Sequence, residues 1–326
     1  MGESLNLLPA SYADFRRMAE RRLPRFLFDY IDGGAVAEVT LRRNTADWEQ
    51  LALVQKVLND ASKMDCSVDL FGEKLALPLV LAPVGMGGMT ARRGEVQAKR
   101  AADAAGIPFC LSTVGICPIE EVAGVSDKPM WFQLYMLKDR GIVQEILERA
   151  WDSGVRTLAF TIDLPVLGTR YRDIRNGMVG GLGPWGRLRS GVIDYAIHTR
   201  WAIDVGLRGG PHGFGTIARY VNQSKNPRDY LAWTGSQFDA SVTWKDIEWL
   251  RKVWKGNLVL KGVLDVEDAR QAIAVGADGM IVSNHGGRQL DGAASTASML
   301  PHIADAVGDK TTLLVDGGIR TGQDLV

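Results

Sequence analysis

The chain has 326 residues, of which 46% are hydrophobic and 23% are charged, so a disordered or fibrous protein is excluded. Lys+Arg and Asp+Glu both number 38, so no overall charge attracts nucleic acid, and we expect no nucleic-acid partner. No apolar run reaches the roughly 18 residues that a membrane-spanning helix needs.

The N-terminal part, residues 1–76, contains a helical pattern around 26–32 that stops at Gly33 and Gly34. We expect this part to form a helical cap. It shows no apolar export signal, and the absence of a C-x-x-C spacing among Cys66, Cys110 and Cys117 favours buried free thiols and no metal. We therefore expect a cytoplasmic protein.

Short apolar runs and helical patterns alternate from residue 77 onward. The predicted strands are 77–84, 109–114, 130–136, 157–163, 258–263, 279–284 and 311–318. The predicted helices are 95–105, 119–122, 140–153, 243–254, 266–275 and 296–307. This alternation predicts a repeated strand–helix unit and hence an α/β fold.

Four of the helical segments end on glycine, the residue that most easily stops a helix: Gly106, Gly154, Gly276 and Gly308. The strands are continuous apolar runs, which predicts a parallel sheet with both faces covered. A closed barrel and an open doubly wound sheet both meet that requirement. Polar residues end several different strands, and this favours a (β/α)8 TIM barrel.

The pattern ends shortly after the seventh predicted strand, with the expected start of a helix at Thr321. A barrel with seven strands leaves two strand edges unpaired. We therefore expect a barrel truncated after strand 7. The expected single domain has four parts, which are the cap 1–76, strands 1–4 in 77–171, an insertion over 172–241, and strands 5–7 in 242–326.

The insertion 172–241 is rich in Gly, Arg and Trp. Insertions of this length are usually functional or disordered. Tryptophan beside arginine is typical of a segment that lies on a lipid surface, but an active-site lid has the same composition. Both interpretations stay open, so contact with a membrane surface is one expectation.

Residues 283–291 read Ser-Asn-His-Gly-Gly-Arg-Gln-Leu-Asp and follow a buried strand, where barrel enzymes carry their catalytic groups. His285 is a candidate base, and Asp163 at another strand end can support its imidazolium. Arg288 and Arg170 offer forked donors for a carboxylate. Tyr135 offers a hydroxyl to a substrate. Taken singly, each of these side chains also has an ordinary structural interpretation.

Lys261 ends another predicted strand, where a cation can stabilise charge on a reduced flavin or simply extend to the surface. Asp316-Gly317-Gly318-Ile319-Arg320 ends the seventh strand, where barrels bind phosphate through backbone N–H groups. A tight turn also needs these glycines. Arg320 favours the phosphate interpretation.

Together, residues 283–291, 132–135, 161–163 with 168–170, 259–262 and 316–320 resemble the FMN-dependent 2-hydroxy acid dehydrogenase and oxidase family. Within that family, residues 82–85, 91–97, 111–114 and 171–173 look most like the respiratory, quinone-linked L-lactate dehydrogenases. The resemblance runs from about residue 9 to the last residue.

The resemblance implies a role for each matching residue. His285 is the base and Asp163 its support. The 2-hydroxy acid is bound by Tyr30, Tyr135, Arg170 and Arg288. FMN is bound by Pro83, Val84, Gly85, Ser112, Gln133, Thr161, Lys261, Ser283, Asp316, Gly317, Gly318 and Arg320. A homo-oligomer is usual in the family.

The expected reaction is oxidation of L-lactate, or a close L-2-hydroxy acid, to the 2-oxo acid, with electrons passed to a quinone or another respiratory acceptor. The expected location is therefore the cytoplasm, with peripheral contact to the inner membrane. A soluble oxidase that reduces O₂ to H₂O₂ is the alternative, although Gly85 stands where the oxidases tend to have alanine. The alternative that is not an enzyme is an inactive fragment without bound FMN.

Overall fold

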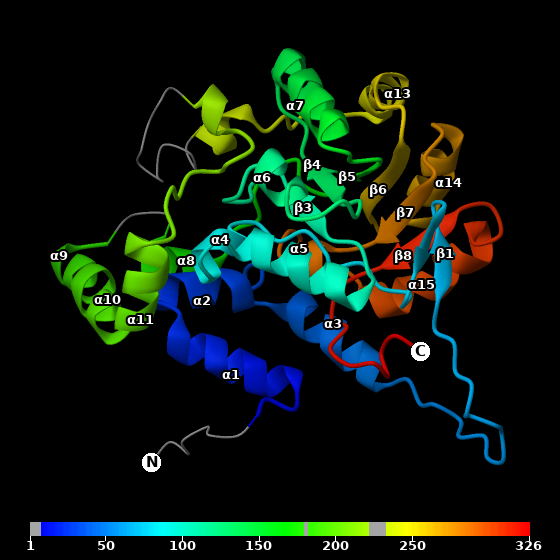
Figure 1. The fold of residues 1–326 in the computed structure, drawn as a ribbon, viewed down its shortest axis with the longest axis horizontal. Helices are drawn as coiled ribbons and strands as arrows, with labels where there is room; N and C mark the ends of the chain where they lie inside the picture. Colours follow the sequence, from blue (N-terminus) through cyan, green and yellow to red (C-terminus); the bar gives the residue numbers. More distant parts are fainter. Residues whose placement is uncertain (1–7, 179–181, 222–232) are drawn as a thin grey trace.

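The computed structural model describes residues 8–178, 182–221 and 233–326. Its centre is a six-stranded sheet in which all neighbouring strands are parallel and follow chain order (Figure 1). The strands are β3 (Cys110–Ser112), β4 (Trp131–Leu134), β5 (Thr157–Thr161), β6 (Asn257–Val263), β7 (Gly279–Val282) and β8 (Thr312–Val315).

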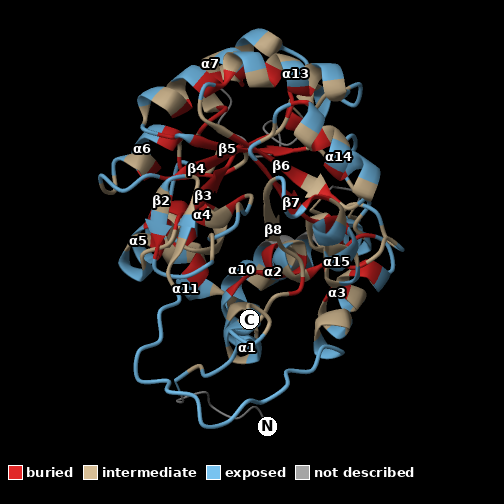
Figure 2. Cartoon of the chain, turned by 90° about the vertical axis from the view of Figure 1, so that its right-hand side faces the viewer, coloured by how far each residue is buried: buried red, intermediate tan, exposed pale blue. Residues whose placement is uncertain are grey.

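A helix connects each strand to the next, as parallel neighbours require. These helices form an outer layer around the buried strands (Figure 2). They are α6 (Ile119–Ala123), α7 (Arg140–Asp152), α13 (Trp244–Val253), α14 (Val266–Ala274) and α15 (Thr296–Val307), and α5 (Gly94–Ala105) precedes β3. The expected α/β fold with a parallel sheet is thereby confirmed.

Burial explains why the strands read as continuous apolar runs. Every residue of β3, β4, β5 and β7 is buried, so side chains on both faces of the sheet are covered. Three of the four expected glycine stops adopt a left-handed backbone, with φ of 68° at Gly106, 86° at Gly154 and 83° at Gly276. These glycines end the helices as the sequence predicts.

The first expected strand, 77–84, differs from the prediction. It contributes only an isolated parallel bridge between Leu81 and Phe109. Pro78 and Pro83 lack the N–H that a ladder needs, which shortens the pairing. The helix expected from Thr321 is also wrong, because the Asp324 carboxylate accepts the N–H groups of Arg320 and Thr321 and closes a turn there.

One hairpin was not expected from the sequence. It pairs β1 (Val68–Leu70) with β2 (Glu73–Leu75) in antiparallel register. The two turn residues have positive φ, 51° at Phe71 and 82° at Gly72. A two-residue turn of this kind matches the twist of the flanking strands.

The N-terminal part forms α1 (Tyr12–Arg22), α2 (Arg25–Asp32) and α3 (Val39–Glu49). Helix α2 is the helix predicted before Gly33. It contacts α8, while α3 contacts α15 and a short 3-10 helix at His285–Gly287. Cys110 and Cys117 are buried free thiols as expected, but Cys66 is a free thiol on the surface because the 51–66 segment is exposed.

After β5 the chain leaves the sheet in a run of short helices. These are α8 (Tyr171–Asn176), α9 (Pro184–Arg187), α10 (Asp194–Ile197), α11 (Thr199–Trp201), π-helices over Leu188–Ile193 and Ala202–Leu207, and a 3-10 helix over Ala218–Tyr220. A further short helix, α4 (Gly87–Thr90), lies earlier in the chain, before α5. Trp201 and Val205 pack against Leu23 and Leu27. Among the described residues, no helix is long and apolar enough to cross a membrane.

Candidate active site

The candidate catalytic pair lies just beyond two strands. His285 Nδ1 and Asp163 Oδ1 are 2.9 Å apart, although 122 positions separate them in the chain. The backbone N–H of His285 donates to Ser283 Oγ at 3.1 Å. Because Nδ1 is engaged by the carboxylate, Nε2 is the ring nitrogen that can exchange a proton with a substrate.

Tyr135 lies beside this pair. Its ring is stacked on the His285 ring with centroids 6.5 Å apart, and Phe238 packs on it with centroids 5.0 Å apart. Burial, together with Tyr30 and Asp163, raises the pKa of Tyr135. The phenol therefore stays protonated and can donate a hydrogen bond.

Two arginines and a tyrosine form the candidate carboxylate site. The Arg288 guanidinium lies over the Tyr30 ring, 5.0 Å from its centroid, and the Arg170 guanidinium lies 5.4 Å from the same centroid. Arg288 also donates to the carbonyl of Gly33 at 2.5 Å. Burial and the neighbouring charge of Arg170 lower the pKa of Arg288. Two cations held this close favour the binding of an anion.

Lys261 is buried in β6, two residues before the strand ends. Its ammonium donates to Ser283 Oγ at 2.8 Å and pairs with Asp316 Oδ2 at 2.6 Å. Burial opposes the charged form, but the carboxylates of Asp316 and Asp163 outweigh this and raise the pKa of Lys261. The lysine is therefore a fixed cation between the candidate base and the end of β8.

A row of polar side chains crosses the ends of β3, β4 and β5. Ser112 Oγ donates to Gln133 Oε1 at 3.1 Å, and Gln133 Nε2 donates to Thr161 Oγ1 at 2.9 Å. All three residues are buried. Buried polar groups are costly unless they are hydrogen-bonded, so this row is a fixed and pre-oriented set of donors and acceptors.

The segment Pro83-Val84-Gly85 follows the Leu81 bridge. Val84 is 53% exposed and presents an apolar surface. A Cβ atom at Gly85 would lie 2.9 Å from Val114 Cγ2 and 3.1 Å from the Tyr30 hydroxyl. A larger residue at position 85 would therefore push on Tyr30.

The two glycines after β8 form the candidate phosphate turn, with φ of 95° at Gly317 and 92° at Gly318. The carbonyl of Gly317 accepts from Trp48 Nε1 at 3.0 Å and from Thr296 Oγ1 at 3.2 Å. Arg320 points elsewhere. Its guanidinium lies over the Tyr12 ring, 4.3 Å from the centroid.

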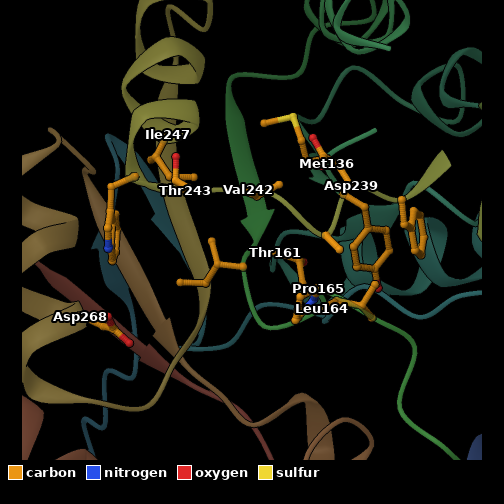
Figure 3. Close-up of a pocket in the computed structure, with 14 residues that line it drawn as sticks. Met136, Thr161, Leu164, Pro165, Asp239, Val242, Thr243, Ile247 and Asp268 are labelled. Atoms are coloured by element: carbon orange, nitrogen blue, oxygen red, sulfur yellow. The ribbon is translucent and has the colours of Figure 1, made fainter. Parts of the chain in front are cut away.

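A cavity of about 350 Å³ lies beside the site, between the ends of β4 and β5 and helix α13 (Figure 3). Its lining includes Tyr135, Thr161, Val242 and Ile247. Its described lining contains no lysine, arginine or histidine. A carboxylate would have no cationic partner in this cavity, whereas Arg288 and Arg170 lie together outside its described lining.

With this geometry established, comparisons with known proteins define the family. A family profile described as FMN-dependent dehydrogenase matches residues 19–326. The chain belongs to the FMN-dependent dehydrogenase family. It is 55% identical to an L-lactate dehydrogenase of Azorhizobium caulinodans and 56% identical to one of Alcaligenes faecalis, over 98% of this chain and 83% of each relative.

Solved structures agree with this placement in the FMN-dependent dehydrogenase family. The monotopic membrane protein (S)-mandelate dehydrogenase superposes with a TM-score of 0.89 at 35% identity, covering 98% of this chain and 83% of that one. A mandelate oxidase with (S)-4-hydroxymandelic acid gives 0.80 at 35% identity, covering 97% of this chain and 81% of that one.

The side chains present fit the FMN that this family uses. Val84 offers an apolar face, the row from Ser112 to Thr161 offers hydrogen bonds, and Lys261 supplies a buried cation. Among the described residues, Asp316 Oδ1 is buried without a hydrogen-bond partner. A buried acceptor of this kind suits a ligand hydroxyl group.

Several residues that shape the site were missed by the sequence analysis. Asn44 on α3 and Asn284 after β7 exchange two amide hydrogen bonds, of 2.8 and 2.7 Å. Trp48 reaches the Gly317 carbonyl. Asn284 stands within the motif that carried His285 and was given no role. Asn44 and Trp48 lie in the predicted cap, where no local signal points to the site.

Proposed function

We propose that the chain is an FMN-dependent L-2-hydroxy acid dehydrogenase whose substrate is L-lactate or a close relative. The observation that carries the proposal is the His285–Asp163 pair, which lies next to Tyr135 and the arginine cluster over Tyr30. A base and a carboxylate site are what oxidation of a 2-hydroxy acid requires. Relatives named L-lactate dehydrogenase, at 55% identity, support lactate as the substrate.

In this proposal His285 Nε2 takes a proton from the substrate. The resulting imidazolium is stabilised by Asp163, whose carboxylate already lies 2.9 Å from Nδ1. A base without that carboxylate would carry an unpaired charge in a partly buried site. The pair is therefore oriented before the substrate arrives.

The substrate carboxylate would lie between Arg288 and Arg170. Guanidinium forks match the two oxygens of a carboxylate, and an anion relieves the repulsion between the two cations. The hydroxyls of Tyr30 and Tyr135 would orient the substrate hydroxyl group. These contacts explain why a 2-hydroxy acid, rather than a simple alcohol, is the proposed substrate.

Bound FMN would accept the two electrons that leave the substrate. The residues proposed to hold it are Pro83, Val84 and Gly85 on one side, Ser112, Gln133, Thr161 and Ser283 at its polar edge, and Lys261. Asp316, Gly317 and Gly318 would hold its ribityl and phosphate groups, together with Arg320 after release from Tyr12. The sheet would then be that of a (β/α)8 barrel, whose active sites lie at this end.

We further propose that the electron acceptor is a quinone and that the protein binds a membrane peripherally. The support comes from the helices between 184 and 207. Trp185 is 82% exposed, Leu207 is 81% exposed and Ile197 is 70% exposed. Solvated apolar side chains next to arginines are typical of an interfacial segment. The similar (S)-mandelate dehydrogenase is a monotopic membrane protein.

The proposed reaction is tested by anaerobic mixing of FMN-loaded protein with L-lactate, D-lactate, glycolate and mandelate while flavin absorbance is followed. We expect L-lactate to bleach the flavin. The variant His285→Ala should keep FMN and lose bleaching by about 10⁴-fold or more. The control His302→Ala changes an exposed histidine on α15 and should react as the unchanged protein does.

Undiminished bleaching in His285→Ala would refute the base assignment. The acceptor is tested separately by turnover with a short-chain quinone and with O₂. Faster turnover with O₂ and release of H₂O₂ would identify an oxidase instead.

A further inference from the structure

The turn that carries His285 has an unusual backbone. Three successive residues have positive φ, 59° at His285, 65° at Gly286 and 71° at Gly287. The left-handed region is uncommon for any residue other than glycine and costs free energy, so the conformation of His285 depends on neighbouring contacts. The position of the imidazole therefore depends on whatever holds this turn.

Asn284 holds the turn from within. Its side-chain oxygen accepts the N–H of Gly287 at 3.0 Å, and its side-chain nitrogen donates to the carbonyl of Ala294 at 2.9 Å. Each of these atoms makes a second hydrogen bond, and both of those go to Asn44 on α3. Asn44 thus completes the hydrogen bonding of the amide that closes the turn.

Helix α3 is itself fixed close to the turn. The Asp291 carboxylate accepts the N–H groups of Ala37 and Thr40, both at 2.9 Å, at the start of the helix. A Cβ at Gly287 would lie 2.5 Å from the backbone nitrogen of Leu41, so the two backbones are in direct contact. Asn44 itself is 1% exposed. A buried amide that pairs with one other amide is a specific constraint.

The same helix reaches the candidate phosphate turn. Trp48, four residues after Asn44, donates to the Gly317 carbonyl. A Cβ at Gly318 would lie 2.0 Å from the carbonyl oxygen of Asn44. One helix of the N-terminal part therefore contacts both the turn of the base and the turn proposed to hold the cofactor phosphate.

We propose that Asn44 is a positioning residue for the reaction, because its side-chain amide fixes the His285–Gly287 turn and so sets the place of the imidazole. Trp48 has the corresponding role for the Gly317–Gly318 turn. The inference rests on the proposed function of His285 as the base. It adds a determinant that touches neither substrate nor cofactor.

The test compares Asn44→Leu, which keeps the volume but removes both hydrogen bonds, with the matched control Arg43→Leu. Arg43 is the neighbouring residue of α3 and donates to the Ala293 carbonyl, so its loss weakens helix contact without touching the turn. In Asn44→Leu we expect flavin reduction by L-lactate to slow about 10- to 100-fold, with the KM for lactate changed less than about 3-fold. Arg43→Leu should stay within about 2-fold.

FMN affinity gives a second readout. Titration of FMN into the FMN-free protein, followed by quenching of flavin fluorescence, should leave Asn44→Leu within about 2-fold of the unchanged protein, because the lost bonds are to the turn of the base. Trp48→Phe should weaken FMN binding about 5-fold. Equal losses of FMN affinity and rate in both variants would indicate a general structural role and overturn the proposal.

A third readout does not depend on the reaction. The chain has four histidines, so NMR can follow the ring signals of His285 separately from those of His198, His212 and His302. We expect Asn44→Leu to shift the His285 signals alone. Unshifted signals, in Asn44→Leu or in Asn44→Ser if the former does not fold, would overturn the inference. Unchanged protein that fails to react with any 2-hydroxy acid would overturn the proposed function and leave this readout standing.

Discussion

Two regions of the molecule depart from the usual distribution of polar and apolar residues, in opposite directions. At the ends of the strands, charged side chains such as Lys261 are buried and paired. In the helices between 184 and 207, apolar side chains such as Trp185 and Leu207 are exposed. Each departure is unfavourable for an isolated folded chain.

The unfavourable side chains of the two regions are compensated in different places. The buried charges are compensated inside the protein, because Lys261 meets Asp316 and His285 meets Asp163. The exposed apolar side chains contact solvent in this structure, and the proposed compensation is a lipid surface. Changes of charge at the strand ends should therefore alter the stability of the fold and leave vesicle binding unchanged. Changes of hydrophobicity in the 184–207 helices should alter vesicle binding and leave the reaction unchanged.

The largest effect is expected for Lys261→Met. This change leaves the Asp316 carboxylate without its cation in a site where the lysine is buried. Removal of one partner from such a pair lowers the free energy of unfolding by about 3 kcal/mol. Urea unfolding followed by tryptophan fluorescence, with and without FMN, measures the loss.

The double variant Lys261→Met with Asp316→Asn removes both charges and should regain at least about half of that loss. Equal stability of the single and the double variant would show that the pair is not a unit. Vesicle binding should be the same in all three proteins.

Much of the fold could be predicted from the sequence because strands covered on both faces read as unbroken apolar runs. The gathering of Asp163, Lys261 and His285 could also be predicted, since the carboxyl ends of parallel strands meet at one edge. For these residues, the position along the chain alone indicates a position in space. The hairpin 68–75 and the shortening of the first expected strand to a single bridge were not predicted, because the first depends on a two-residue turn and the second on prolines.

The remaining contacts of the site depend on tertiary packing and leave no local pattern. The Asn44–Asn284 pair joins positions that are 240 residues apart. The Arg320 guanidinium lies on Tyr12, a ring from the first helix, although its motif predicts a phosphate contact. In each case the partner comes from the N-terminal helices, whose place over the site has no sequence signature.

The second prediction concerns the exposed region. Trp185→Ser should lower binding to anionic lipid vesicles about tenfold, because one large apolar side chain no longer enters the lipid interface. Dye-linked oxidation of L-lactate should be unchanged. Val54→Ser is the matched control, since Val54 is 87% exposed but lies between α3 and β1. Co-sedimentation at low salt measures both. Equal losses in the two variants would contradict docking through the 184–207 helices.

The smallest effect is expected at the end of the insertion, where Asp239 pairs with Arg140 of α7. The Asp239 carboxylate accepts a hydrogen bond from the Ser241 hydroxyl and forms an ion pair with Arg140. These contacts lower the pKa of Asp239 to about 2. A carboxyl whose pKa is lowered by folding stabilises the protein above its ordinary value of about 4, and this contribution disappears as the pH falls toward 2. Asp239→Asn should therefore reduce the drop in Tm between pH 5 and pH 2.5 by about 2 °C.

Asp268 provides the opposite control. Burial and the neighbouring Asp265 and Glu267 raise the pKa of Asp268, so its charged form destabilises the fold above the ordinary value. Asp268→Asn should then make the same drop in Tm slightly larger, because it raises stability at pH 5 and not at pH 2.5. A change of the same sign in both variants would show that total charge, and not the Arg140–Asp239 contact between α7 and the end of the insertion, sets the response to acid.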